Sequence, residues 1–390
     1  MEIKFSNYEE LPGFYIVNLP SVQQKYQQWI QHLPKIKPYY AVKCNPDTKI
    51  LKTLADLGAN FDCASQAEIE TVLNLEVDAS RIIFAHPTKL VSHLKFAKQK
   101  GVSLMTFDNV DELTKISKHY PDAKLVLRIS TDDRGALCQF SSKYGARSSE
   151  YTQLLEHGSS LGLNIVGVSF HIGSGSQDSQ AFPKAISEAA NVFNLAKSYG
   201  YTLKLLDIGG GFLGSYTSSA FATVAAKILE SIESLATFDA DTQIIAEPGR
   251  YFVTESQTLY LAIISRRRLL CDEEVKFIYY VSDGVYHSFN CIFFDHAQPQ
   301  VELIYPAGAK CRGEDSDSDS DRDSSASNAN RYSSTIFGPT CDALDRICKD
   351  VQIPELEVGD WICFKNMGAY TTAAASSFNG FPLPQRFYIE

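Results

Sequence analysis

The sequence predicts an α/β fold: a closed (β/α)8 barrel of parallel strands, joined to a second, mostly β domain. Two observations predict the barrel. Short apolar segments alternate with amphipathic ones through the first two-thirds of the 390 residues, and eight of the apolar segments are typical of strands. Polar residues lie late in these segments or just beyond them, as expected at the C-terminal rim of a barrel, where the chemistry of such folds is found. An open, doubly wound sheet would use fewer strand ends.

The barrel is expected to span residues 18–256. Its eight strand candidates are, in order, Tyr39–Lys43, Phe61–Ser65, Ile82–His86, Leu104–Phe107, Leu125–Ile129, Gly167–Ile172, Leu205–Ile208 and Ile244–Glu247. The amphipathic segments between them predict helices at Ser65–Leu75, Asp111–His119, Ala181–Ser198 and Ser219–Leu235.

After about Tyr251 the helical pattern gives way to strands separated by turns, which predicts a β domain made of residues 1–17 plus 257–390. Its strand candidates are Gln257–Ser265, Lys276–Val281 and Trp361–Lys365, and the first residues, through about Val17, are expected to add a strand. Short helices are expected around Thr340–Lys349 and Thr371–Phe378. Residues of about 312–332 are rich in Ser and Asp with almost no apolar side chain, so this loop is expected to be disordered.

Composition excludes several classes of partner. The net charge is −10, but the six acids and one Arg between Glu314 and Asp323 supply −5 of it, so the rest of the chain is only mildly acidic. Nothing indicates a nucleic-acid surface. Nine cysteines without a CxxC pair are typical of reduced thiols in the cytoplasm. No apolar run reaches the length of a membrane span, and the N-terminus lacks the apolar core of a signal peptide.

Lys43 is the most informative residue. It ends the apolar, aromatic segment Pro38–Val42 and is followed by a turn at Asn45-Pro46. Burial at a strand end favours the neutral amine, which is the nucleophile that a Schiff base requires. Taken alone, the residue could equally be a lysine whose stem packs while its ammonium reaches water.

Two further strand ends carry candidates for binding. His171 is followed by the small residues Gly173–Ser176 and could be a base, a flat surface for a heteroaromatic ring, or a satisfied core histidine; no HxH or HExxH motif supplies partners for a metal, so no metal site is expected. Gly209–Gly211 could offer backbone N–H groups to a phosphate or could simply form a tight turn. With Gly214 they match GxGxxG, but this match follows the seventh strand and lies outside a first βαβ unit.

Two further pairs of residues complete the candidates. Glu247 and Arg250 could form a surface ion pair, or could bind a protonated ring nitrogen and a phosphate, respectively. Cys341 adjoins Asp342 after a turn; it could be a half-buried thiol of the usual kind or a proton donor.

Seven segments together resemble the eukaryotic-type ornithine decarboxylases, and the resemblance runs from about Pro12 to Tyr388. The segments are Tyr40–Asn45, Phe61–Ser65, Phe170–Ser176, Asp207–Phe212, Glu247–Arg250, Gly338–Asp345 and Gly368–Phe381. The resemblance implies an alanine-racemase-like barrel with a β domain, pyridoxal 5'-phosphate as cofactor, and decarboxylation of L-ornithine to putrescine and CO2, the first step of polyamine biosynthesis.

The resemblance also implies roles for individual residues. The implied catalytic residues are Lys43, His171 and Cys341. Lys43 would carry the cofactor as an imine, and Cys341 would be the proton donor. The implied cofactor-binding residues are Lys43, Asp62, Arg128, His171, Ser174, Gly210, Gly211, Glu247, Pro248, Gly249, Arg250 and Tyr370, with Glu68 nearby. The implied substrate-binding residues are Phe294, Asp295, Asp342 and Phe378. The family's active sites are shared across a homodimer, with Lys43, His171 and Glu247 from one subunit and Cys341, Asp342 and Phe378 from the other.

Other functions remain open at this point. A lysine or mixed basic amino acid decarboxylase differs by one methylene of substrate, and a non-catalytic, antizyme-inhibitor-like protein would keep the fold but bind only a regulator. An antizyme-like regulator is a possible partner of the enzyme as well. A racemase fits the Cys341-Asp342 pair less well. The chain departs from the family at His287, where Gly is common, and at His86, where Asn is common; His287 could alter packing beneath the substrate loop.

Overall fold

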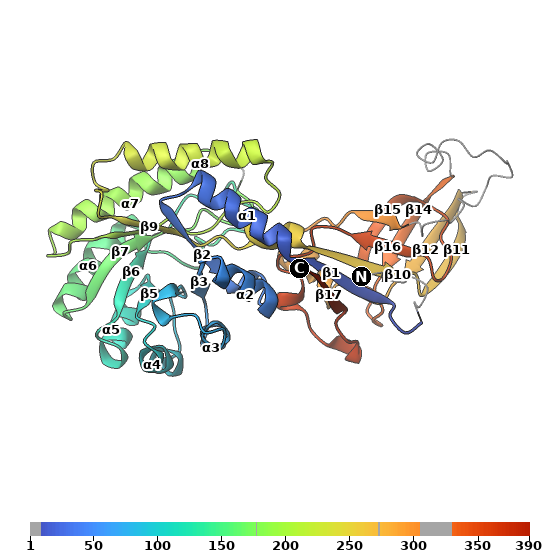
Figure 1. Cartoon of the computed structure of the whole chain (residues 1–390), viewed down its shortest axis with the longest axis horizontal. Helices are drawn as coiled ribbons and strands as arrows, with labels where there is room; N and C mark the ends of the chain where they lie inside the picture. Colours follow the sequence, from blue (N-terminus) through green and yellow to red (C-terminus); the bar gives the residue numbers. More distant parts are fainter. Residues whose placement is uncertain (1–8, 177, 272–273, 305–329) are drawn as a thin grey trace. The chain divides into compact units, whose positions relative to one another are not determined.

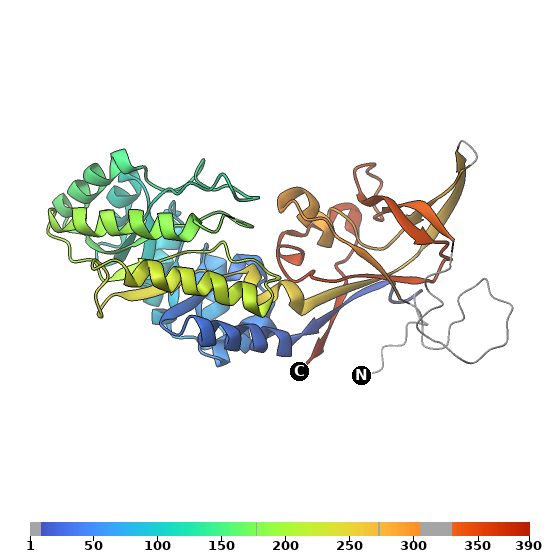
Figure 2. The same ribbon diagram turned by 90° about the horizontal axis from the view of Figure 1, so that it is seen from above.

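The structure, a computed structural model, describes residues 9–176, 178–271, 274–304 and 330–390. The chain divides into two compact units (Figures 1 and 2). The barrel unit is Leu19–Thr254, and the β unit combines Met1–Asn18 with Glu255–Glu390. Within the described ranges, no helix combines the length and the apolar character needed to cross a membrane.

Eight parallel strands close the barrel, as predicted, and the last strand pairs with the first through Ile36 and Ile244. In barrel order the strands are β2 (Ile36–Ala41), β3 (Asn60–Cys63), β4 (Ile82–Phe84), β5 (Leu104–Phe107), β6 (Lys124–Arg128), β7 (Asn164–Ser169), β8 (Leu205–Asp207) and β9 (Gln243–Ala246). Because all eight run in the same direction, their carboxyl ends meet at one rim.

Helices surround the barrel, and α7 and α8 run alongside each other on its outer face (Figures 1 and 2). The helices are α1 (Leu19–His32), α2 (Thr48–Asp56), α3 (Gln66–Leu73), α4 (Val91–Lys100), α5 (Val110–His119), α6 (Tyr151–Ser160), α7 (Ala181–Lys197), α8 (Ser218–Glu233) and the short α9 (Arg250–Val253). Four of them begin at side chains that accept backbone N–H groups, which lowers the cost of starting a helix. These caps are Asp47, Ser65, Asn109 and Thr217.

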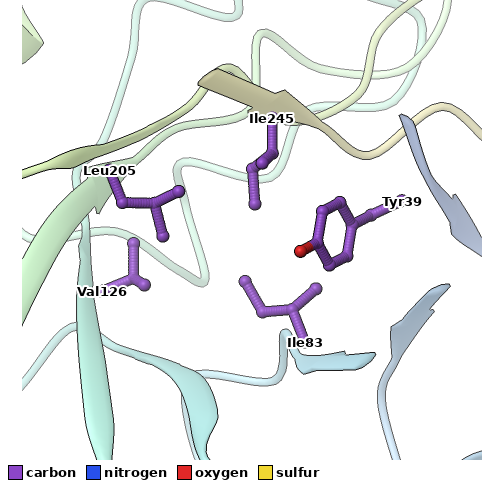
Figure 3. Close-up of a cluster of buried hydrophobic side chains, with 5 residues drawn as sticks. All are labelled: Tyr39, Ile83, Val126, Leu205 and Ile245. Carbon is purple, nitrogen blue, oxygen red and sulfur yellow. The ribbon is translucent and has the colours of Figure 1, made fainter. Parts of the chain in front are cut away.

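Apolar side chains fill the lower part of the barrel interior. Figure 3 shows them converging from five strands: Tyr39, Ile83, Val126, Leu205 and Ile245. Because side chains alternate along a strand, the residue two positions further on faces inward at the next level toward the rim. That next level is polar in three of these strands or just beyond them, where it holds Arg128, Asp207 and Glu247.

Most of the strands end earlier than the sequence predicted. β2 ends at Ala41, and Val42–Cys44 forms a 3₁₀-helix, so Lys43 lies beyond the strand. His171 and Glu247 likewise follow β7 and β9. The prediction overran because the residues after the strands, such as Val42 and Ile208, are as buried as the strands themselves. Lys43, His171 and Glu247 therefore lie just beyond the ends of their strands, at the rim of the barrel.

The β unit contains two sheets. The five-stranded sheet has the order β13 (Val301–Ile304), β16 (Trp361–Phe364), β10 (Gln257–Ala262), β1 (Gly13–Asn18) and β17 (Gln385–Ile389). The four-stranded sheet has the order β11 (Ser265–Cys271), β12 (Glu274–Tyr280), β14 (Arg331–Phe337) and β15 (Arg346–Pro354). The predicted N-terminal strand is confirmed as β1, which pairs antiparallel with β10. Phe14 anchors it by stacking on Tyr260, with ring centroids 5.2 Å apart.

Other predictions for this unit need correction. The helix expected around Thr340–Lys349 is wrong, because residues 340–345 form a turn and β15 begins at Arg346. The segment Thr371–Phe378 contains only short 3₁₀ turns, at Thr372–Ala374 and Phe378–Gly380. Of the loop predicted at about 312–332, residues 312–329 lie outside the described residues, and Arg331 and Tyr332 belong to β14.

Candidate active site

Lys43 and Asp62 form an ion pair at the rim of the barrel. Strand β2 pairs with β3 so that Ala41 lies opposite Asp62, and Lys43 follows two residues later. The Lys43 ammonium donates to the Asp62 carboxylate, which is fully buried, while the lysine side chain is 42% exposed. The amine is therefore held at the mouth of the barrel by a carboxylate beneath it and remains accessible from outside.

Asp207 and Glu247 add two more carboxyl groups at the rim of the barrel, near Lys43 and Asp62. Asp207 Oδ1 accepts from the N–H of Gly209 at 2.8 Å, and the N–H of Glu247 donates to the carbonyl of Gly209 at 2.7 Å. Burial raises the pKa of Asp207 to about 7. Burial, and then the nearby Asp207 and Asp62, raise the pKa of Glu247 well above its usual range, although Lys43 opposes the effect. This pair therefore holds a proton near neutral pH.

The Asp207 and Glu247 side chains hydrogen-bond to each other, so the proton that the pair holds is shared between them. Apart from this shared contact, Glu247 Oε1 and Asp207 Oδ2 are buried and have no other hydrogen-bond partner among the residues that the structure describes. A cationic donor placed beside Glu247 would take the place of the shared proton.

His171 is a neutral imidazole whose contacts fix which ring nitrogen carries the proton. Its Nδ1 accepts from the N–H of Gly173 at 3.0 Å, so the ring proton of the neutral form lies on Nε2. Burial and the positive charges of Arg128, Lys43 and Arg250 hold the pKa of His171 well below its usual value. Phe140 packs edge-on against the ring, with centroids 4.9 Å apart and planes at 89°. The ring is thus fixed in orientation and carries no charge.

The three-glycine turn after β8 lies against this ring. A Cβ on Gly210 would lie 2.6 Å from His171 Nε2 and 3.0 Å from the carbonyl oxygen of Glu247. Gly211 has a φ of +110°, and a Cβ there would lie 2.4 Å from Ile172 Cγ1. Both positions therefore require glycine, and the tight turn and the open backbone expected from the sequence are the same feature.

Arg250 joins this group from the start of α9. Its Nε and Nη2 donate to Ser174 Oγ at 3.0 and 2.8 Å, so residues 76 apart in the chain meet. Pro248 and Gly249 precede it. The Pro248 carbonyl accepts from the N–H of Ala41 at 3.2 Å, and a Cβ on Gly249 would lie 2.9 Å from Cys44 Cβ. These contacts place the Glu247–Arg250 segment beside the Lys43 turn.

Within the β unit, the structure brings together Cys341, Asp342 and Phe378. Tyr286 connects them: its hydroxyl donates to Asp342 Oδ2, and its ring stacks on Phe378 with centroids 4.3 Å apart. The N–H of Leu344 and the Tyr286 hydroxyl lower the pKa of Asp342, which is therefore ionised at neutral pH.

The other predicted residues of this unit come from separate segments. Phe294 ends α10 (Cys291–Phe294), Asp295 follows it, and the Phe294 side chain is 73% exposed. Tyr370 has a φ of +54°, a left-handed conformation that is uncommon for a bulky residue. Strain of this kind is found most often at functional sites.

Sequence reasoning missed Asp345, which supports the turn that carries Cys341 and Asp342. Its buried carboxylate accepts from the N–H of Val285 at 2.8 Å and from the N–H and hydroxyl of Thr340 at 3.0 and 2.7 Å. A Cβ at Gly284 or Gly338 would lie 2.0 or 2.3 Å from Asp345 Oδ1, so glycine is required at both positions. The glycines and the acid within Gly338–Asp345 were the available signal.

The two departures from the resemblance lie near the predicted residues. His287 is buried, burial lowers its pKa, and its ring faces Phe381 edge-on at 6.4 Å. His86 packs edge-on against Tyr144, with centroids 5.8 Å apart, and the Arg128 guanidinium lies over the same Tyr144 ring at 5.3 Å. His86 thus borders the barrel site, and His287 directly follows Tyr286.

Comparisons with known proteins identify the family of this chain. The profile of the family described as pyridoxal-dependent decarboxylase, pyridoxal binding domain, matches residues 19–254. The ornithine decarboxylase of Mus musculus is 42% identical over 98% of this chain and 82% of its own length. Antizyme inhibitor 2 of Xenopus laevis is 44% identical over 96% of this chain and 80% of its own length. The crystal structure of the Paramecium bursaria Chlorella virus arginine decarboxylase matches with a TM-score of 0.88 and 36% identity, over 97% of this chain and 96% of that one. The chain belongs to the pyridoxal-dependent decarboxylase family.

Proposed function

We propose that this chain decarboxylates L-ornithine to putrescine and CO2 with pyridoxal 5'-phosphate, the first step of polyamine synthesis. The observation that carries the proposal is the pairing of an accessible Lys43 amine with Asp62 in the same rim that holds the buried Asp207–Glu247 pair. The curated decarboxylases at 42–44% identity over nearly the whole chain support the substrate. The cytoplasm is proposed as the site of action, from the cysteine usage.

The residues present fit the cofactor. The site holds three acids (Asp62, Asp207 and Glu247) and two cations (Lys43 and Arg128), and its charge is balanced when Asp207 and Glu247 share one proton; a protonated pyridine nitrogen would replace that proton and keep the balance. Such a nitrogen would donate to the Glu247 carboxylate, which has no partner besides Asp207 among the described residues. Ser174, Gly210, Gly211, Arg250 and Tyr370 would hold the phosphate, for which a fork of guanidinium donors and open glycine backbone are suited.

Bound pyridoxal phosphate supplies the electron sink for the pair left behind when CO2 departs. The chain supplies the rest. Lys43, oriented by Asp62, would hold the cofactor through its amine. Glu247 would hold a proton at the ring nitrogen. The His171 ring would pack against the cofactor, and it would bring no positive charge there because its pKa is held well below the usual value.

The β unit is proposed to supply the proton donor and the substrate acids. The Cys341 thiol would return a proton to Cα, and the ionised Asp342, with Asp295, would bind the distal ammonium of ornithine beside Phe294 and Phe378. We propose that these residues complete the barrel site of a second copy in a homodimer, which would give two shared sites.

Two alternatives are tested with the proposal. Lysine is one methylene longer than ornithine, and a methylene is worth only about 1–3 kcal/mol of discrimination. An antizyme-inhibitor-like function is compatible with the 44% identity to such a protein. The presence of Lys43, Glu247, Cys341, Asp342 and Tyr370 supports an enzyme instead. Binding of an antizyme-like regulator is compatible with either function.

The deciding experiment measures CO2 release from ornithine, lysine and arginine, with and without added pyridoxal phosphate. We expect cofactor-dependent release that is fastest with ornithine and is abolished in Lys43→Ala. The matched control is Lys52→Ala, which removes an exposed lysine of α2 whose ion pair within the described ranges is with Asp56. Faster turnover of lysine or arginine would overturn the substrate assignment, and no release from any of the three would support the binding-protein alternative.

A further inference from the structure

The turn that carries Cys341 is held at several points by the β unit, and one of these points is the peptide of Cys341 itself. The N–H of Cys341 donates to Asn379 Oδ1 at 3.2 Å. Asn379 lies in the 3₁₀ turn Phe378–Gly380, 38 residues further along the chain. The sequence analysis assigns no role to this residue.

Asn379 has a backbone conformation that few residues adopt. Its φ is +56° and its ψ is 11°, in the left-handed region. Asparagine and glycine tolerate this region better than other residues, and only asparagine of the two brings a carbonyl acceptor on a short side chain. The residue type thus meets two requirements at once: the turn of the backbone and the acceptor for Cys341.

The segment that carries Asn379 is fixed on its own side. Phe378 stacks on Tyr286, with centroids 4.3 Å apart and planes at 26°. The N–H of Ser376 donates to the Tyr286 carbonyl at 2.9 Å. Because the Tyr286 hydroxyl also donates to Asp342, the two segments are connected on both sides of the Cys341 peptide.

The residue before Cys341 is held from the opposite side. Thr340 donates its N–H and its hydroxyl to the buried Asp345 carboxylate. Contacts at Thr340, at the N–H of Cys341 and at the Asp342 side chain therefore fix the backbone over three successive residues. With the backbone fixed, the thiol can sample only the staggered positions of one torsion angle.

We propose that Asn379 is a positioning residue for Cys341: its side-chain carbonyl holds the Cys341 peptide so that the thiol points at the reacting carbon. The proposal rests on the proposed function, in which the S–H bond of Cys341 breaks and its proton goes to Cα, leaving a thiolate and putrescine after release. When the thiol is misdirected, the proton goes instead to the cofactor carbon that bears the imine. Hydrolysis with one water then gives the amino aldehyde and pyridoxamine phosphate.

The test compares Asn379→Gly, Asn379→Asp and Cys341→Ala in the purified holoenzyme. Asn379→Gly keeps the left-handed backbone but removes the acceptor, whereas Asn379→Asp keeps an acceptor at Oδ1. Asp350→Gly is the matched control: Asp350 is also left-handed, with a φ of +55°, and its side chain accepts from Ser333 at 3.3 Å, away from Cys341. The readouts are the ratio of aldehyde to putrescine and the rate of Cys341 alkylation by iodoacetamide, which needs no turnover.

We expect Asn379→Gly to raise the aldehyde ratio by about two- to tenfold, the range that one hydrogen bond supplies, and to change the alkylation rate. Asn379→Asp and Asp350→Gly should stay close to the wild type in both. If Cys341→Ala raises the aldehyde ratio but Asn379→Gly leaves it at the wild-type value, the positioning role is overturned while the proposed function stands. If Cys341→Ala leaves the ratio unchanged, Cys341 is not the donor, and both this role and that part of the proposed function are overturned.

Discussion

Replacing Gly210 by alanine tests the barrel site with one methyl group. The added Cβ would lie 2.6 Å from His171 Nε2 and 3.0 Å from the Glu247 carbonyl oxygen. His171 cannot turn away freely, because Phe140 packs against its ring and Gly173 donates to its Nδ1. Overpacking a well-packed site costs about 1–3 kcal/mol. If that cost falls on the cofactor-bound form, affinity for pyridoxal phosphate falls by about 5- to 150-fold.

The measurement is a titration of the cofactor-free protein with pyridoxal phosphate, followed by absorbance. Gly135→Ala is the matched control, since among the residues with described positions a Cβ there would meet only Asp178 Cβ, at an ordinary 3.4 Å. Thermal unfolding of both cofactor-free variants shows how much of the cost falls on the fold itself. Wild-type affinity in Gly210→Ala, with an unchanged unfolding temperature, would refute the placement of this turn against His171 and the cofactor.

Three further predictions test other residues of the candidate site. The pKa of Asp207 is about 7 in the folded, cofactor-free chain, against 3.8 as its ordinary value, so the folded state binds the proton more tightly. The stability that this proton contributes is complete below about pH 4 and is lost as the pH rises to about 7. The unfolding temperature should therefore fall less steeply between about pH 4 and about pH 7 in Asp207→Asn than in the wild type. Equal slopes of unfolding temperature against pH would contradict the pKa shift. Cys341→Ala should divert product to the aldehyde and pyridoxamine phosphate, and chromatography showing unchanged products would remove its role as donor. Mixing inactive Lys43→Ala and Cys341→Ala subunits should restore about a quarter of wild-type activity if sites are shared at random across a two-fold interface, whereas proven heterodimers without recovery would contradict shared sites.

The fold could be predicted because its signals are local. Each barrel strand is a short apolar segment between polar turns, and eight of them in alternation with amphipathic helices leave few other arrangements. The strand ends could not be predicted, because burial continues past them: Val42 and Ile208 are fully buried although neither lies in a strand. Hydrophobic pattern reports burial, and burial does not distinguish a strand from the loop that covers the barrel rim.

The candidate site likewise contains residues that the sequence reveals and partners that it does not. Lys43, His171 and Glu247 stand out as isolated polar residues at the ends of apolar segments. Their partners do not, because partnership depends on which strands are neighbours: Asp62 reaches Lys43 only because β2 pairs with β3. The turn at residues 340–345 was mistaken for a helix for a similar reason. It is held by Asp345, which binds Val285 across 60 residues of sequence.

The central claim is that Lys43 carries the cofactor, and reduction with borohydride tests it most directly. Reduction of the holoenzyme converts the imine to a stable secondary amine, which peptide mapping by mass spectrometry then locates. Lys89 is another lysine of the barrel that could compete for the cofactor aldehyde. Burial lowers its pKa to about 8, although the ion pair with Glu112 opposes this effect. We predict a single labelled peptide that contains Lys43. A label on Lys89 or on any other lysine, or no label at all, would contradict the account.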